Sequence, residues 1–107
     1  MSTTDLRFVY MTAGSKDEAT RIGKMLVQER LAACVNIVDN MTSLYWWEEE
    51  VQSDTETVCI AKTTSANASA LIEKVKSLHS YTTPCIVTLP ILEGNARYLD
   101  WLRNETR

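Results

Sequence analysis

The stretch Thr42-Ser-Leu-Tyr-Trp-Trp-Glu48 decides the fold, because it holds two of the three tryptophans of the chain side by side. Its residue types favour a β-strand, and neighbouring side chains of a strand point to opposite faces of the sheet. Trp46 and Trp47 are therefore expected to cover both faces of one sheet. A small monomer usually leaves one face of an antiparallel sheet in water. We expect the protein's own helices to cover one face and another subunit the other. Alternatively, one indole is core and the other lies on the surface.

Hydrophobic periodicity on both sides of this stretch predicts a β-α-β-β-α-β order followed by a terminal helix. Ser15 and Glu18 have the spacing of a capping box, and Gly23 in the same helix indicates a close approach of helix to sheet. Asp39-Asn40 is predicted to be a turn, and Glu48-Glu49-Glu50 a solvated hairpin tip. The predicted strands are 6–13, 32–38, 42–48, 51–64 and 85–90. The first predicted helix begins after Ser15, the second has Ser65 as its cap, and the terminal helix spans 95–103.

This order indicates an α+β, ferredoxin-like fold, in which an antiparallel sheet carries both helices on one face. Such a sheet leaves its other face bare unless something covers it. The two adjacent indoles require the same cover. We therefore expect the chain to associate with copies of itself, which would cover the bare face and pair exposed strand edges.

Composition bounds the class of protein. The chain has 107 residues, of which 45% are hydrophobic, so it fits one domain over residues 1–107. A net charge of −3 without a basic stripe argues against nucleic-acid binding. No apolar run approaches the ~18 residues of a membrane span, and the start lacks the layout of a signal peptide. Three cysteines in apolar contexts, without C-x-x-C spacing, indicate reduced, buried thiols in the cytoplasm.

Five segments together resemble the CutA family of divalent-cation tolerance proteins, in the family's order and over nearly the whole chain. The resemblance implies a ferredoxin-like fold, a cytoplasmic homotrimer, and an association with copper and other divalent cations. The same trimeric architecture is similar to that of PII-type signalling proteins, a likeness of fold that does not transfer function. The segments are Arg30-Leu-Ala-Ala-Cys-Val-Asn-Ile37, Thr42–Glu48, Lys62-Thr-Thr64, His79-Ser-Tyr-Thr-Thr-Pro84 and Asn95-Ala-Arg-Tyr-Leu-Asp-Trp-Leu102.

The chain departs from the family pattern at three places. Asp39-Asn40 stands where the family usually has Pro-Gly, and Glu49 stands where it usually has Gly at the hairpin tip. If that tip needs a positive φ, a residue other than Gly is mildly strained there. Ser80 and Cys85 stand where the family usually has Pro and Glu, beside the candidate site.

The metal ligands that the resemblance implies fall on Met11, Leu78 and His79, of which only His79 keeps an imidazole. A neutral imidazole suits Cu(II) or Zn(II); alternatively, His79 caps the preceding helix. The Met11 thioether would bind Cu(I) or simply pack in the core. Cys85, six positions after His79, adds a soft donor or is a buried strand cysteine. We therefore predict His79, Cys85 and Met11 as ligands for copper or another divalent cation.

A cleft is predicted around Trp47, Glu56, Lys62 and Tyr81, next to His79. Glu56 and Lys62 share one face of a strand but lie about 20 Å apart along it. Each therefore needs a partner from elsewhere, such as a neighbouring subunit. An acid, a cation, an imidazole and a phenol between subunits would bind a small polar ligand or a hydrated ion. Alternatively, these residues form the rim of a subunit interface.

The favoured function is a homotrimeric cytoplasmic protein of divalent metal ion tolerance that binds copper without turnover. The alternative is a PII-like module that senses a small molecule in inter-subunit clefts, with metal binding incidental. An enzyme is not expected, because the sequence has no Ser-His-Asp order, metal-hydrolase motif or Walker loop. The loop after the first strand carries Lys16 but lacks the Arg that acyl-phosphate hydrolysis on this fold needs.

Overall fold

The computed structural model describes residues 5–107, and its elements follow the predicted β-α-β-β-α-β order with a terminal helix, except that the predicted strands 32–38 and 42–48 form one strand. The four strands form one antiparallel sheet in the order β2-β3-β1-β4, which is the ferredoxin-like arrangement. The α+β class is therefore confirmed. The elements are β1 (Leu6–Ala13), α1 (Lys16–Gln28), β2 (Cys34–Trp47), β3 (Glu50–Thr64), α2 (Ser65–Leu78), β4 (Ile86–Pro90) and α3 (Ala96–Glu105).

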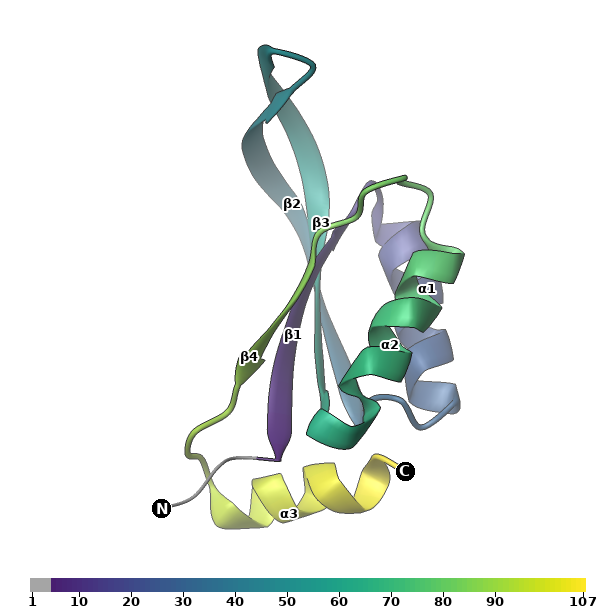
Figure 1. Cartoon of the computed structure of the whole chain (residues 1–107), viewed down its shortest axis with the longest axis vertical. Coiled ribbons are helices and arrows are strands. Elements are labelled where there is room, and N and C mark those ends of the chain that lie inside the picture. Colours follow the sequence, from purple (N-terminus) through teal and green to yellow (C-terminus); the bar gives the residue numbers. More distant parts are fainter. Residues whose placement is uncertain (1–4) are drawn as a thin grey trace.

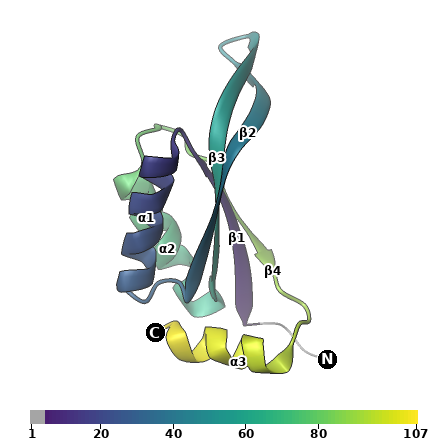
Figure 2. The same cartoon turned by 180° about the vertical axis from the view of Figure 1, so that it is seen from behind.

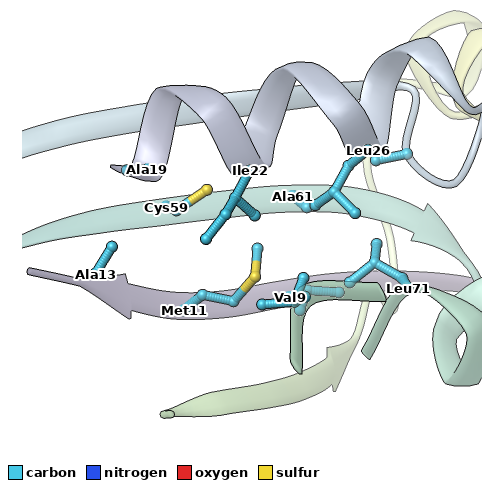
Figure 3. Close-up of a cluster of buried hydrophobic side chains, with 11 residues drawn as sticks. Val9, Met11, Ala13, Ala19, Ile22, Leu26, Cys59, Ala61 and Leu71 are labelled. Atoms are coloured by element: carbon cyan, nitrogen blue, oxygen red, sulfur yellow. The ribbon is translucent and has the colours of Figure 1, made fainter. Parts of the chain in front are cut away.

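The helices α1 and α2 lie side by side on one face of the sheet, and α3 crosses the end of the sheet where β1 begins (Figures 1 and 2). The core fills the space between this face and the two helices (Figure 3). Gly23 marks a close approach, as predicted, because an added Cβ would lie 2.9 Å from Cγ1 of Val35 on β2. None of the helices in residues 5–107 is long and apolar enough to cross a membrane.

The start of α1 after Ser15 is confirmed, whereas the capping box there and the predicted cap of α2 differ from the structure. Oγ of Ser15 accepts from the Glu18 N–H at 3.1 Å, as a capping box requires. The Glu18 carboxylate does not complete the box, because it bonds to Gly14 and Ser80 instead. The cap of α2 is Thr64, not Ser65, because Thr64 still pairs with Leu6 at the extended end of β3 and its hydroxyl accepts from Asn67.

The predicted turn at Asp39-Asn40 is wrong, because β2 runs through these residues as a β-bulge. Val38 pairs with Val58 and Met41 with Glu56, so Asp39 and Asn40 together stand opposite one residue of β3. Asp39 Oδ1 accepts from the Thr57 hydroxyl and the Asn40 N–H, both at 2.8 Å, and Asn40 has a φ of 61°. An inserted residue turns every later side chain to the other face. The bulge therefore brings Tyr45 and Trp47 to the face opposite the helices.

The expectation that the protein's own helices cover one indole is also wrong. Trp46 is 72% exposed and Trp47 50%. The reason is strand length: β2 and β3 have 14 and 15 residues, whereas β1 and β4 have 8 and 5. The far half of the β2–β3 hairpin consequently extends beyond the helices, as Figure 1 shows.

The hairpin tip lies where the sequence predicts it. Trp47 pairs with Glu50, so Glu48 and Glu49 form the connecting turn. Both have a positive φ, of 51° and 69°. Positive φ at both central residues is the geometry of a type I′ turn, which normally selects Asn-Gly. The strain expected at Glu49 is therefore present.

The sheet face opposite the helices, here called the open face, is uncovered in the single chain. Val38, Val87 and Leu89 on this face are each more than half exposed. Two of the three cysteines that were expected to be buried are also outside the core: Cys34 is half-buried and Cys85 exposed, and only Cys59 is buried. The cause is the same, since the helices cover one face of the sheet only.

Candidate functional site

A cleft of about 620 Å³ lies between the β2–β3 hairpin and the loop of residues 79–85. Its volume is within the range of pockets that hold small molecules. β1 contributes Tyr10, β2 contributes Tyr45 and Trp47, and β3 contributes Glu56. The loop contributes Tyr81 and Cys85. Of the predicted cleft residues, Trp47, Glu56 and Tyr81 thus lie together.

Two phenol–carboxylate pairs stand in and beside this cleft. The Tyr81 hydroxyl donates to Glu56 Oε2 at 2.9 Å, and the Tyr45 hydroxyl donates to Asp54 Oδ2. Burial and the hydrogen bond to Glu56 raise the pKa of Tyr81 to about 12. The hydrogen bond to Asp54 raises the pKa of Tyr45 as well. Both phenols therefore keep their protons at neutral pH and act as hydrogen-bond donors to the carboxylates.

His79 lies under the loop and is committed to hydrogen bonds inside the protein. Its side chain is 1% exposed. Nε2 lies 2.8 Å from the Thr12 carbonyl oxygen, which can only accept, so this nitrogen carries the proton. Nδ1 accepts from the Tyr81 N–H at 3.1 Å. Both nitrogens of the imidazole are thus bonded inside the protein, and neither is free to bind a ligand in the cleft.

Glu18 anchors the same loop. Its carboxylate accepts from the Ser80 N–H at 2.7 Å and from the Gly14 N–H at 3.3 Å, and lies 3.7 Å from Nδ1 of His79. Burial alone would raise the pKa of Glu18, but the bonds to Ser80 and Gly14 outweigh it, and the pKa lies below its usual value. The sequence reading missed this role because the capping-box spacing already accounted for the residue.

Lys62 lies away from the cleft. Its ammonium donates to Asn36 Oδ1 at 3.1 Å and lies 5.6 Å from the centroid of the Tyr98 ring on α3. The hydroxyl of Tyr98 is 3.4 Å from Sγ of Cys34, the cross-strand neighbour of Lys62. The structure of the single chain therefore does not bring Lys62 and Glu56 together.

The three predicted metal ligands are not brought together either. Met11 is 1% exposed and packs between the sheet and the helices, as Figure 3 shows. Cys85 lines the cleft on the open face, where partial burial raises its pKa and the negative charge of Glu56 adds to the shift. Within residues 5–107, no three His, Cys, Asp or Glu side chains gather as metal ligands would. His79, Cys85 and Met11 thus do not fit a shared ion in the single chain.

Asp54, Tyr45 and Tyr10 belong to the site although the sequence reading left them out. The alternation of β3 places Asp54 on the same face as Glu56, which was a usable signal. Tyr45 shares a face with Trp47 by the same rule. Tyr10 has no comparable signal, because its place beside the hairpin depends on the pairing of β1 with β3, where it stands opposite Ile60.

Comparison with known proteins identifies the family. A model of the family described as CutA1 divalent ion tolerance protein matches residues 7–105. This chain belongs to that family. A divalent-cation tolerance protein CutA of Thermus thermophilus is 54% identical over 98 residues, which cover 92% of this chain and 95% of that protein. A CutA of Archaeoglobus fulgidus is 46% identical over 95 residues, 89% of this chain and 92% of that protein.

Solved CutA structures have the same fold. The Cut A1 protein of Thermus thermophilus superposes with a TM-score of 0.93 at 52% identity and covers 95% of this chain and 99% of that one. CutA1 of Oryza sativa gives 0.94 at 45% identity and covers 98% and 96% of the two chains. CutA proteins are named for ion tolerance and not for a reaction.

The CutA relatives are described as residents of different compartments. A CutA structure from Archaeoglobus fulgidus is described as periplasmic. Protein CutA 1 of Oryza sativa is described as chloroplastic, and this chain, 46% identical over 99 residues, spans 56% of its length. Family membership alone therefore does not fix where a CutA protein resides.

Proposed function

We propose that this CutA protein is a homotrimeric, single-domain protein of the cytoplasm that acts in divalent metal ion tolerance by binding copper or another divalent cation. The observation that supports it best is the cleft, which the Cys85 thiol and the Glu56 carboxylate both line. Sulfur and oxygen donors together suit a borderline cation. Three free cysteines are consistent with a reducing compartment.

The uncovered open face supports the homotrimer. Apolar side chains that stay exposed on one face of a monomer usually mark an interface. Val38, Val87 and Leu89 form such a surface, and the exposed indoles of Trp46 and Trp47 lie beyond it on the hairpin. Cyclic association of three copies would cover this surface and place each cleft beside a neighbouring chain.

Among the predicted ligands, Cys85 is the one that faces the cleft. His79 would offer Nδ1 to an ion only after losing the Tyr81 N–H, and Met11 would have to leave the core. Each of these changes costs a hydrogen bond or buried apolar contacts. We therefore expect the ion to bind weakly, through Cys85 and Glu56 first.

Calorimetric titration with Cu(I), Cu(II) and Zn(II) tests this proposal. We expect binding of copper that weakens about tenfold or more in Cys85→Ser, since the serine hydroxyl is a poor ligand. Cys34→Ser is the matched control, because its half-buried thiol lies outside the cleft and its loss should change nothing. Equal affinities for the wild type and Cys85→Ser, or no binding of any ion, would refute a metal site in the cleft.

The alternative function is a PII-like module that senses a small molecule between subunits, with metal binding incidental. The specific observation in its favour is the aromatic lining of the cleft, to which Tyr10, Tyr45, Trp47 and Tyr81 contribute. A metal centre has no need of such a lining. This function predicts that a small molecule protects the protein against heat when all three ions fail to do so.

A further inference from the structure

The cleft carries negative charge that no cation of the same chain neutralises. Glu56 and Asp54 occupy alternate positions of β3 and so share the open face. Within residues 5–107, neither carboxylate forms an ion pair with Lys, Arg or His. None of the residues that line the cleft is basic. The hydrogen bonds from the two phenols occupy Oε2 of Glu56 and Oδ2 of Asp54, which leaves the second oxygen of each carboxylate.

Two aromatic rings stand beside this charge. Tyr45 on β2 contacts Asp54 and Tyr81 on the loop contacts Glu56, and the two side chains are 40% and 39% exposed in the single chain, so a ligand can reach them. The face of an aromatic ring carries partial negative charge and attracts a cation that lies on it. Each phenol donates a hydrogen bond to a carboxylate, so its oxygen presents only lone pairs to a ligand. Carboxylates and ring faces thus favour the same sign of ligand charge.

We propose that this cleft is a binding site for a small organic cation with an alkylated ammonium group. Glu56 and Asp54 supply the counter-charge, and Tyr81 and Tyr45, which contact them, supply the aromatic walls. The inference goes beyond metal tolerance, since it uses ring faces and a carboxylate and leaves the Cys85 thiol without a role. A phosphate or carboxylate ligand would meet two negative groups and no positive partner from this chain.

Choline and 3,3-dimethylbutan-1-ol provide the test, because they share a shape and differ in charge. Calorimetry on the full-length protein should give choline an affinity at least about tenfold higher than that of the neutral alcohol. Glu56→Gln keeps the size and the acceptor for Tyr81 but removes the charge, and should weaken choline about tenfold. Glu73→Gln, on the surface of α2 away from the cleft, is the matched control and should have no effect.

Four results would overturn the inference: no choline binding at 10 mM (an order-of-magnitude limit, about −3 kcal/mol), equal affinities for choline and the alcohol, unchanged choline affinity in Glu56→Gln, or tighter binding of inorganic phosphate. Lys62→Gln tests whether a lysine of a second copy already fills the cleft. In that case choline would bind to this variant and not to the wild type, and that result would also overturn the inference. Cys85→Ser should retain choline binding, so this inference and the metal proposal fail separately.

Discussion

At the scale of single residues, Glu18 has the clearest structural role near the site. Its buried carboxylate accepts backbone hydrogen bonds from Ser80 in the loop of residues 79–85 and from Gly14 between β1 and α1, and lies beside His79. The loop that carries Tyr81 and Cys85 is therefore held by a side chain that does not line the cleft. A change at Glu18 should alter stability and the position of the loop together.

Glu18→Gln should lower the free energy of unfolding at pH 7 by about 1–3 kcal/mol, the usual cost of weakened bonds to a buried charged group. The folded state holds the pKa of Glu18 below the value of 4.5 for the unfolded chain. Its stabilisation is therefore present above pH 4.5 and is lost as the pH falls through the lower, folded pKa. Urea unfolding of the wild type and of Glu18→Gln at pH 7 and at pH 3 measures both effects. The difference in free energy of unfolding between the two proteins should be smaller at pH 3 than at pH 7.

Glu73→Gln is the matched control for this prediction. Its carboxylate is 71% exposed and pairs with Lys76 on the surface of α2. Such a pair contributes only about 0–1 kcal/mol. If the two variants lose the same small amount of stability, or if Glu18→Gln differs from the wild type as much in acid as at neutral pH, the role assigned to Glu18 is wrong.

Glu49 is a residue in a conformation that suits glycine, with a φ of 69° at the second position of the hairpin turn. Glu49→Gly should raise the free energy of unfolding by about 0.5–1 kcal/mol, because the left-handed region costs glycine nothing. Glu50→Gly, one residue further in β3, should destabilise by a similar amount, since there glycine only adds entropy to the unfolded chain. Thermal unfolding of both variants measures the two signs, and a loss of stability in Glu49→Gly would contradict the prediction.

At the scale of elements, the contact of α1 with β2 depends on Gly23. A Cβ at this position would come within 2.9 Å of Cγ1 of Val35, closer than side chains normally approach. Gly23→Ala should therefore destabilise by about 1–3 kcal/mol, although alanine is the better helix former by about 1 kcal/mol.

The double variant tests that explanation. Val35→Ala removes the methyl groups that an added Cβ would meet, so Gly23→Ala should cost much less in its presence. Urea unfolding of the two single variants and the double variant gives the coupling. Additive losses would show that the space between α1 and β2 is not what requires glycine at Gly23.

Periodicity was sufficient to predict the elements but not how they end or bend. Apolar residues repeat with a period of 2 in the strands and 3.6 in the helices, and this periodicity is visible in the local sequence. The bulge at Asp39-Asn40 is not visible there, because the same residue pair suits a turn. Its formation depends on Thr57, 18 positions away, whose hydroxyl bonds to Asp39. An interaction between strands decided this point, and a local pattern cannot contain it.

At the scale of the whole molecule, local sequence patterns likewise predicted one part of the site, and contacts between distant residues determine the other part. Trp47, Glu56 and Tyr81 were predicted together and line one cleft, because strand alternation and a loop suffice to place them. The partners of Lys62, on Asn36 and Tyr98, required the pairing of β2 with β3 and the path of α3. Both His79 nitrogens form hydrogen bonds, one with the Thr12 carbonyl and one with the Tyr81 N–H. The spacing of these residues in the sequence gives no sign of either bond.

The exposure of both indoles also belongs to this scale. The prediction that the helices cover one of the two tryptophans was wrong, because the β2–β3 hairpin extends beyond the helices. In the proposed trimer, neighbouring copies of the chain would therefore cover the open face and contact the hairpin as well. The trimer is thus the feature on which the proposed cleft between subunits depends.

Sedimentation equilibrium over a wide range of protein concentration measures this feature most directly. We expect a single species with three times the chain mass of 12.1 kDa, and a lower mass in Trp47→Ala, which removes an aromatic side chain from the contact. A wild-type protein that sediments as a stable 12.1 kDa monomer at every concentration would contradict the proposed trimer.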